Sequence, residues 1–392
     1  MDQIIKITPD FDYSKVDNFR TKKLEGHVTI LKTGLPVADA YLINPSVYSF
    51  WKNKESFPEN FHEKLEESIN DILTKFQSIT LRTCFRFDGF ENPRALPAWR
   101  KLKKKERILE SIIEAYKKGQ EIAKKNKISN YGLGLILMGR VDGIKGGVMI
   151  VDIGKENLCM IDSCWGDNLL ITDGESGFDT FWVDEDLKII KEEIREKKYG
   201  YFFNGIEKVK KSIDESKVLV PSLNDQEIRK LVEYGFKGAK FHDSNVEIEF
   251  LIGEDSKIEA YELQLKHGFK LENPKLKRKS NSLVEGTSVF PGKITGNVKI
   301  IEKEEHLSKV NKGDILIVIP MDIPTFLPVV DKAAAIITDS GGITSHLATI
   351  AREFKIPCIV GTENASKILK DGDRIIFDGG RGTISTVGQN EG

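Results

Sequence analysis

The residues best suited to carry chemistry lie in one segment, residues 333–353. A run of small and β-branched residues is followed there by two glycines, two hydroxyl residues and a histidine: Gly341, Gly342, Thr344, Ser345 and His346. Threonine and serine are favoured N-cap residues, so the pattern predicts a buried strand, a tight turn and a helix beginning at Thr344 or Ser345. His346 then falls in the first helical turn, where free N–H groups and the positive end of the dipole favour an anion.

A neutral imidazole at this position can attack phosphorus and then hold the transferred phosphoryl group. The hydroxyls of Thr344 and Ser345, with the N–H groups after Gly341, are expected to solvate the phosphate oxygens. A histidine without such a context is more often a structural or surface residue. We give that interpretation to the other histidines, which are His27, His62, His242, His267 and His306.

Length and composition indicate a globular protein of two or three domains. The chain has 392 residues, and its 59 Lys and Arg against 60 Asp and Glu give a net charge of −1,. This balance argues against a globally basic nucleic-acid-binding protein. No apolar run approaches 18 residues and the N-terminus lacks a signal-peptide pattern, so we expect no membrane span. Four cysteines without CxxC spacing predict a reduced, cytoplasmic protein,.

A change in composition divides the chain. Residues 268–285 are polar and charged and predict a flexible linker,. Before it, residues 1–267 alternate helical and strand-like stretches, which predicts an α+β domain of two subdomains. Helices are expected at residues 60–76, 100–125 and 225–240, and strands include residues 26–31, 38–43, 134–138, 147–153, 158–161, 180–183, 246–252 and 258–265,. After the linker, short β-rich runs and one helix predict a compact β/α domain over residues 286–392,.

The histidine segment resembles a known family. Residues 338–353 match the pattern Thr-Asp-x-Gly-Gly-x-Thr-x-His-x-Ala-x-x-Ala-Arg-Glu at every fixed position. This pattern is typical of the swivelling phosphohistidine domain of phosphoenolpyruvate synthase and pyruvate phosphate dikinase. The resemblance covers residues 286–387, and it implies that His346 is the phosphorylated residue on a domain that swivels.

The N-terminal part resembles the ATP-grasp domain of the same family. Lys23 and Arg82 match a nucleotide-binding lysine and a phosphate-contacting arginine, and residues 135–151, Met138 among them, resemble the strand pair beside the adenine. The resemblance implies ATP as substrate and Mg²⁺ as cofactor, bound by Glu249 and Gln264. These two residues lie on strands joined by a short loop, which can set two oxygen ligands side by side. The alternative for this acidic strand is an ordinary solvent-facing alternation.

The resemblance implies a dikinase-type phosphotransferase that moves a phosphoryl group from ATP to His346 and on to an acceptor, leaving AMP and a second phosphate. The family's pyruvate-binding barrel has no counterpart before Gly392. We therefore expect the acceptor to be pyruvate on a separate subunit, or a small molecule that docks directly. The family's glycine-rich approach to Lys23 is missing, and so is its phosphate-covering loop after Arg82. These departures keep an alternative open: a non-catalytic or carrier phosphohistidine module with a degenerate nucleotide-binding half.

Overall fold

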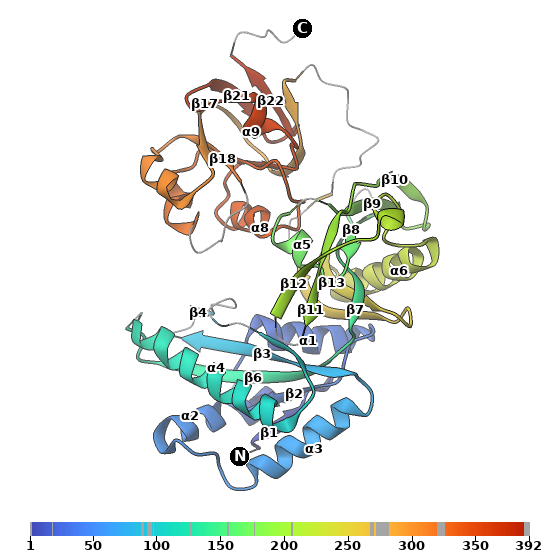
Figure 1. Ribbon diagram of the computed structural model, residues 1–392, viewed down its shortest axis with the longest axis vertical. Helices are drawn as coiled ribbons and strands as arrows, with labels where there is room; N and C mark the ends of the chain where they lie inside the picture. The colour runs from blue at the N-terminus through green and yellow to red at the C-terminus, as the bar shows by residue number, and fades with distance from the viewer. Residues whose placement is uncertain are drawn as a thin grey trace.

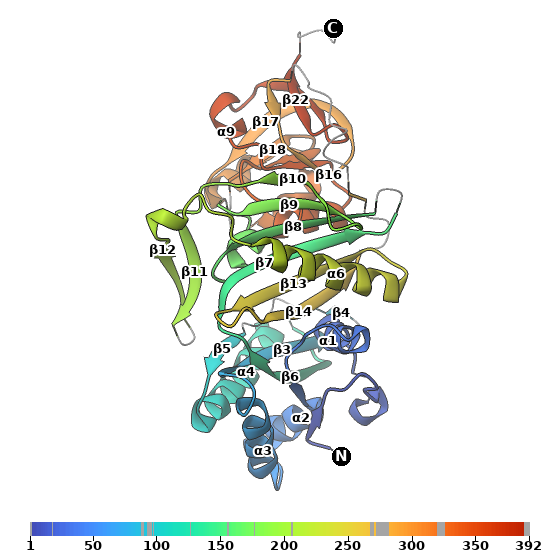
Figure 2. The ribbon, with the colours of Figure 1, turned by 90° about the vertical axis from the view of Figure 1, so that its right-hand side faces the viewer.

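The chain forms three parts arranged in a row. The computed structural model describes residues 2–17, 19–87, 90–91, 96, 98–125, 127–154, 157–175, 177–204, 207–266, 270–271, 282–319 and 326–387, without the side chains of residues 87, 90, 91 and 204. The described residues between 2 and 140 lie at one end and the C-terminal domain at the other, with a second sheet between them (Figures 1 and 2).

The first part is a sheet in the order β1-β2-β6-β3-β4, with β5 also paired to β3. Its strands are β1 (Ile4–Lys6), β2 (Ala40–Ile43), β3 (Ser78–Phe87), β4 (Phe90–Glu91), β5 (Trp99–Leu102) and β6 (Tyr131–Arg140). Its helices are α1 (Lys22–Thr33), α2 (Pro45–Lys54), α3 (Phe61–Leu73) and α4 (Lys105–Lys125), with a 3-10 turn at Tyr13–Val16. Helices α2, α3 and α4 pack their apolar residues on one face of the sheet, and α1 covers the other.

The strand predicted at residues 26–31 is wrong, because these residues lie within α1. Thr21 caps the helix by accepting a hydrogen bond from Leu24 N–H, and Gly34 ends it with a φ of 64°,. Leu24 and Val28, four residues apart, face the sheet. Short apolar runs are ambiguous between helix and strand, and here the capping residues decide.

The central sheet has the order β10-β9-β8-β7-β13-β14. Its strands are β7 (Gly143–Asp152), β8 (Leu158–Trp165), β9 (Asp179–Asp184), β10 (Ile189–Glu193), β13 (Val246–Gly253) and β14 (Ile258–Leu265). Helix α6 (Asp225–His242) covers one face through Ile228, Leu231 and Val232 (Figure 2). The short helix α5 (Leu169–Thr172) follows β8, and a separate hairpin of β11 (Tyr199–Asn204) and β12 (Glu207–Ser212) packs near it. A 3-10 turn covers Glu215–Lys217.

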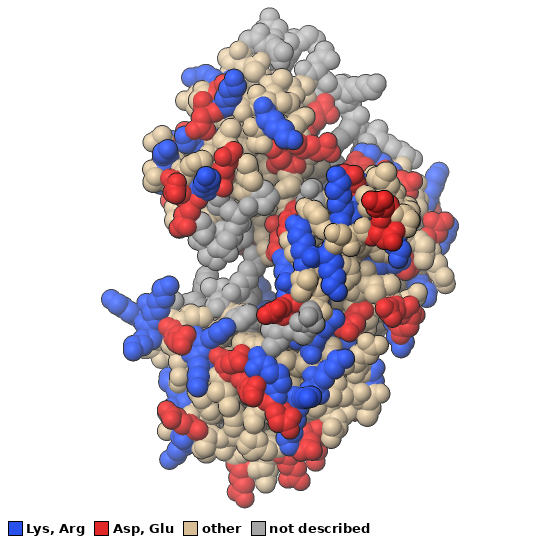
Figure 3. Space-filling view, viewed as in Figure 1, with Lys and Arg blue, Asp and Glu red and all other residues tan. Residues whose placement is uncertain are grey.

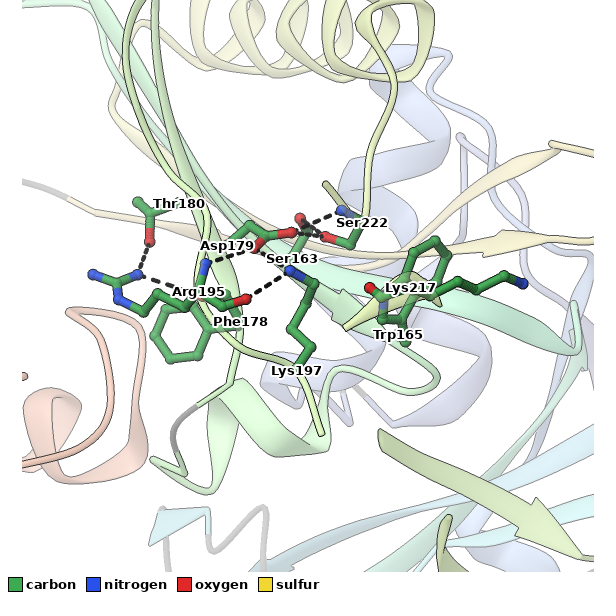
Figure 4. A network of polar contacts seen from close by, with 9 residues as sticks. All are labelled: Ser163, Trp165, Phe178, Asp179, Thr180, Arg195, Lys197, Lys217 and Ser222. Atoms are coloured by element: carbon green, nitrogen blue, oxygen red, sulfur yellow. Dashed lines mark hydrogen bonds and ion pairs between the residues drawn. The ribbon is translucent and has the colours of Figure 1, made fainter. Parts of the chain in front are cut away.

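A buried ion pair links the segment between β10 and β11 to this sheet. Lys197 Nζ lies 2.6 Å from Asp179 Oδ1, and both side chains are 0% exposed. Ser222 donates to the other carboxylate oxygen through its backbone N–H and its hydroxyl, at 2.7 and 2.8 Å. Lys197 also donates to the Arg195 carbonyl oxygen at 2.8 Å (Figure 4). The carboxylate thus has several donors, as a buried charge requires.

The C-terminal domain is built on a mixed sheet in the order β15-β22-β21-β17-β18-β19-β20-β16. Its strands are β15 (Val284–Glu285), β16 (Thr287–Phe290), β17 (Lys293–Ile301), β18 (Ile315–Val318), β19 (Ala335–Ile337), β20 (Cys358–Val360), β21 (Arg374–Asp378) and β22 (Thr383–Thr386). Its helices are α8 (His346–Glu353) and α9 (Ala365–Ile368), with 3-10 turns at Glu304–Lys309 and Leu327–Lys332. Strands β17, β18, β19 and β20 are parallel neighbours. The predicted β/α domain is confirmed, and its expected helix is α8, whereas the short helix α9 was not predicted.

Most of the predicted linker, residues 268–285, lies outside the described residues. Within it, Leu271 is buried and its N–H donates to Asp152 Oδ2 at 2.6 Å. Val284 and Glu285 pair with β22, so the C-terminal sheet begins two residues before the expected boundary. In the part of the chain that is described, no helix has the length and apolar character needed to cross a bilayer.

Candidate active site

The predicted strand, turn and helix around His346 are confirmed. Strand β19 ends at Ile337, and Gly341 then turns the chain with a φ of 86°. Ser345 is the N-cap of α8, and His346 is the first helical residue. The His346 side chain is 29% exposed, so its ring is accessible at the surface of the domain.

The two hydroxyls beside the histidine have protein partners rather than open surroundings. Thr344 Oγ1 donates to Asp162 Oδ2 at 3.2 Å, which joins the C-terminal domain to β8 of the central sheet. Ser345 Oγ accepts from Ala348 N–H at 3.4 Å. Both side chains are buried. We expected both hydroxyls to solvate a phosphate. In the observed arrangement the Thr344 hydroxyl instead binds the central sheet, and the Ser345 hydroxyl caps the helix.

Further contacts fix the glycine turn against the central sheet. Ser340 Oγ donates to the Gly174 carbonyl oxygen at 2.7 Å. A Cβ atom on Gly342 would lie 2.8 Å from Asp162 Oδ2, so a larger residue here would displace the Asp162 carboxylate. Ile343 packs in the same apolar cluster as Ile150 and Met160 of the central sheet. The histidine turn thus sits on the face of the sheet opposite α6.

Strand register places this docking point close to the predicted metal ligands. Val148 of β7 stands opposite Asp162 on one side and opposite Glu249 of β13 on the other. Directly opposed residues share a face, and neighbouring strands are about 4.8 Å apart. Asp162, which holds the histidine turn, is therefore about 10 Å from Glu249 across the same face.

A β-bulge brings two carboxylates together at Glu249. Phe250 pairs with Ala260 but Glu249 pairs with Glu262, so Tyr261 is the extra residue on β14,. The bulge shifts the alternation of β14 by one residue and puts Glu262 and Gln264 on the face that carries Glu249. Tyr261 Oη donates to Glu249 Oε2 at 2.7 Å. Burial, and next the charge of Glu262, raise the pKa of Glu249 to about 7,.

Arg82 and Lys23, the two cations predicted to bind phosphate, lie next to this carboxylate pair. Arg82 Nη2 lies 2.5 Å from Glu262 Oε2, and Nη1 donates to the Tyr261 carbonyl oxygen at 3.0 Å. Lys23 Nζ donates to the Thr83 carbonyl oxygen at 3.0 Å, next to Arg82. The structure thus brings Lys23, Arg82, Glu249 and Gln264 to one place. Met138 lies on the same side of its sheet but is 1% exposed, within the apolar cluster under α1.

The carboxylate pair suits a hard divalent cation. Glu249 and Glu262 supply oxygen ligands whose mutual repulsion a cation would relieve. Gln264 lies beside them; its Nε2 donates to Glu262 Oε1 at 2.9 Å, and its Oε1 accepts from Lys266 at 3.2 Å. Among the described residues, no group of three or more His, Cys, Asp or Glu side chains is arranged to hold a metal. Mg²⁺ commonly binds through one or two carboxylates, with phosphates and water as its other ligands.

Sequence reasoning missed several polar residues of this site: Asp162, Asp173, Asn168, Tyr261 and Glu262. Asn168 Nδ2 donates to Glu249 Oε2 at 2.9 Å and so fixes that carboxylate. Asp173 Oδ1 lies 3.8 Å from His346 Nδ1. No local pattern in the sequence indicates these residues, because their contacts join segments that are far apart in the chain.

A cavity of about 1270 Å³ lies beside the site, between the N-terminal ATP-grasp-like part of the chain and the C-terminal domain. Gln264 and Lys266 line it from β14, Trp182 from β9, and Thr349 and Arg352 from α8. The cavity therefore reaches the predicted metal ligand Gln264, and it borders the helix that carries the histidine.

His27 gives the site region a pH-dependent stability. It lies in α1 and is buried, and burial followed by the nearby charge of Arg82 lowers its pKa to about 4. The folded state holds it neutral while the unfolded state takes up a proton below pH 6.5. The free energy of unfolding should therefore fall by about 3 kcal/mol more in the wild type than in His27→Gln as the pH drops from 6.5 to 4. Urea unfolding at several pH values measures this difference; parallel pH dependences would contradict it.

Two segments of the chain match known protein families. Residues 102–283 match "Pyruvate phosphate dikinase, AMP/ATP-binding domain", and residues 310–382 match "PEP-utilising enzyme, mobile domain". The chain is therefore similar, over both of these segments, to the phosphoenolpyruvate synthase and pyruvate phosphate dikinase family. It combines an ATP-grasp-like N-terminal domain with a C-terminal phosphohistidine domain, which confirms the fold class expected from the sequence.

Similar curated proteins are named phosphoenolpyruvate synthases. The chain is 32% identical over 260 residues to a probable phosphoenolpyruvate synthase of Methanothermobacter thermautotrophicus, covering 64% of this chain and 37% of that protein. It is 31% identical over 261 residues to a probable phosphoenolpyruvate synthase of Archaeoglobus fulgidus, covering 64% and 34%. The chain thus matches about a third of the length of these relatives.

Proposed function

We propose that this chain is a dikinase-type phosphotransferase that transfers a phosphoryl group from ATP to His346 and then to an acceptor. In this half-reaction one nitrogen of His346 attacks the β-phosphorus of ATP, a P–N bond forms, and the bond to the oxygen of the α-phosphate breaks, so that AMP leaves and a pyrophosphoryl group stays on the ring. Water then attacks the γ-phosphorus and breaks its bond to the bridging oxygen, which releases inorganic phosphate and leaves one phosphoryl group on His346. The four cysteines all lie among the described residues, are buried and form no disulfide, which agrees with a reducing compartment such as the cytoplasm,.

One observation carries this proposal: the histidine turn and the Glu249–Glu262 pair share one face of the central sheet, about 10 Å apart at Asp162 and Glu249,. A triphosphate can bridge that distance. Arg82 and Lys23 bring positive charge to the same place, where it would bind the phosphate oxygens,. Bound Mg²⁺, held by Glu249 and Glu262 with Gln264 beside them, would neutralise developing phosphate charge.

The acceptor is proposed from the relatives. Phosphoenolpyruvate synthases are named for a three-carbon product, so pyruvate on a separate subunit is our first choice. The second is a small molecule that docks directly in the cavity beside α8, where the lining offers Lys266 and Arg352. In both cases His346 carries the phosphoryl group on the swivelling domain to that acceptor.

Labelled ATP tests the transfer to His346. The wild-type protein is incubated with Mg²⁺ and with ATP labelled at either the β- or the γ-phosphate, and protein-bound label is measured together with AMP and ADP. We expect acid-labile label and AMP in the wild type and no protein-bound label in His346→Ala. Label that persists in His346→Ala would refute the assignment of the histidine, and ADP as the sole nucleotide product would refute dikinase chemistry.

The carrier alternative has an observation of its own. Arg82 is paired with Glu262, and Lys23 is bound to a backbone carbonyl, so both cations already have partners within the chain. In a scaffold without nucleotide chemistry, these contacts within the chain would be the whole role of Arg82 and Lys23. Calorimetry separates the two functions: the proposed enzyme binds ADP, more tightly with Mg²⁺, whereas the carrier binds none.

A further inference from the structure

The histidine faces a carboxylate that belongs to the other domain. Asp173 follows α5 directly, as its C-cap residue, and its Oδ1 lies 3.8 Å from His346 Nδ1. This distance is within ion-pair range and longer than a hydrogen bond. Catalytic hydrogen bonds are often long before substrate binds and tighten in the complex.

Two neighbouring contacts fix the approach of Asp173 to the ring. Ser340 donates to the carbonyl oxygen of Gly174, the next residue along the chain, and Thr344 donates to Asp162. The other oxygen of Asp173 accepts from Lys208 Nζ at 2.6 Å. Lys208 belongs to β12 of the β11–β12 hairpin, which also carries Lys210 and Lys211, and blue basic side chains gather over this region in Figure 3. The carboxylate is thus held between a lysine of its own domain and the histidine of the swivelling domain.

We infer that Asp173 is a positioning residue for His346, supplied by the nucleotide-binding domain only while the two domains are docked. This inference rests on the proposed transfer from ATP to His346. A carboxylate beside Nδ1 favours the tautomer with the proton on Nδ1, which leaves the Nε2 lone pair as the nucleophile.

The charge of the reacting ring gives Asp173 a second effect. When Nε2 bonds to phosphorus, the electron pair of the broken P–O bond stays on the leaving phosphate oxygen. The imidazole keeps its Nδ1 proton at that moment and becomes positively charged. A carboxylate 3.8 Å from Nδ1 stabilises this charge, and Lys208 keeps that carboxylate oriented,. Once the domains separate, the phosphorylated ring no longer faces Asp173.

The test compares Asp173→Ala with Glu175→Ala in the full chain. Glu175 lies two residues further along and pairs with Lys210, so its loss removes the same charge from the same turn. Rapid-quench measurement of His346 labelling is expected to show a rate at least about tenfold lower in Asp173→Ala and unchanged in Glu175→Ala. Equal rates in the wild type and Asp173→Ala would overturn the inference.

A second readout does not depend on activity. Nitrogen NMR of ¹⁵N-histidine-labelled protein, with His346→Ala to assign the signals, reports which ring nitrogen carries the proton. We expect the Nδ1–H form in the wild type and in Glu175→Ala, and a shift toward Nε2–H in Asp173→Ala. An unchanged tautomer would overturn the positioning role. If the wild type takes up no label but the tautomer shifts, the proposed function fails and the positioning of the ring stands.

Discussion

Replacing Lys197 with methionine is expected to lower the free energy of unfolding by about 3–5 kcal/mol. The ammonium group is fully buried against Asp179, and its removal leaves that carboxylate buried without its counter-charge. The donors from Ser222 remain, but hydrogen bonds alone do not neutralise the charge,. Chemical denaturation measures this loss of free energy, with the unfolding of residues 1–267 as the transition that is monitored.

The neighbouring residue provides the control. Lys198 has the same side chain at the next position, is 67% exposed and pairs with Glu196 at the surface. Lys198→Met should change the free energy of unfolding by less than about 0.5 kcal/mol. Combining Lys197→Met with Asp179→Asn should recover part of the loss, because no unpaired charge is then buried. A Lys197→Met protein as stable as Lys198→Met would contradict this account.

The local features of the fold could be predicted from the sequence because each depends on residues close together in the chain. Helices α3, α4 and α6 follow from apolar residues at three- and four-residue steps,. The strand, turn and helix around His346 follow from two glycines and an N-cap serine. Residues 26–31 were expected to form a strand but lie in α1. Local prediction fails there because a short apolar run fits both a helix and a strand.

The missing parts of the site depend on register and on docking, which have no local signature. Glu262 faces Glu249 only because Tyr261 is an extra residue in β14, and regular pairing would have placed Tyr261 there instead. Thr344 meets Asp162 only when two domains dock. Lys197 stands in a stretch rich in Lys and Glu that resembles a solvated surface. In each case a contact between distant segments decides the role of the residue.

Replacing Glu249 with glutamine is expected to slow the labelling of His346 by about 100-fold or more, because several kcal/mol of charge stabilisation depend on the cation site. The same change should abolish the gain in ADP affinity that Mg²⁺ gives in calorimetry, a readout that needs no turnover. Glu254→Gln, in the exposed loop of the same hairpin, removes an equal charge and should leave both measurements unchanged.

The pH dependence of cation binding provides a sharper form of this prediction. The pKa of Glu249 is raised to about 7, so the folded protein holds a proton there at pH 6 that a bound cation must displace,. Affinity for Mg²⁺ with ADP should therefore rise as the pH increases from 6 to 8 and level off once the carboxylate is ionised. The glutamine variant cannot ionise and should lose this rise. A wild type whose affinity is flat over this range, or a variant that keeps the rise, would show that Glu249 does not hold the cation.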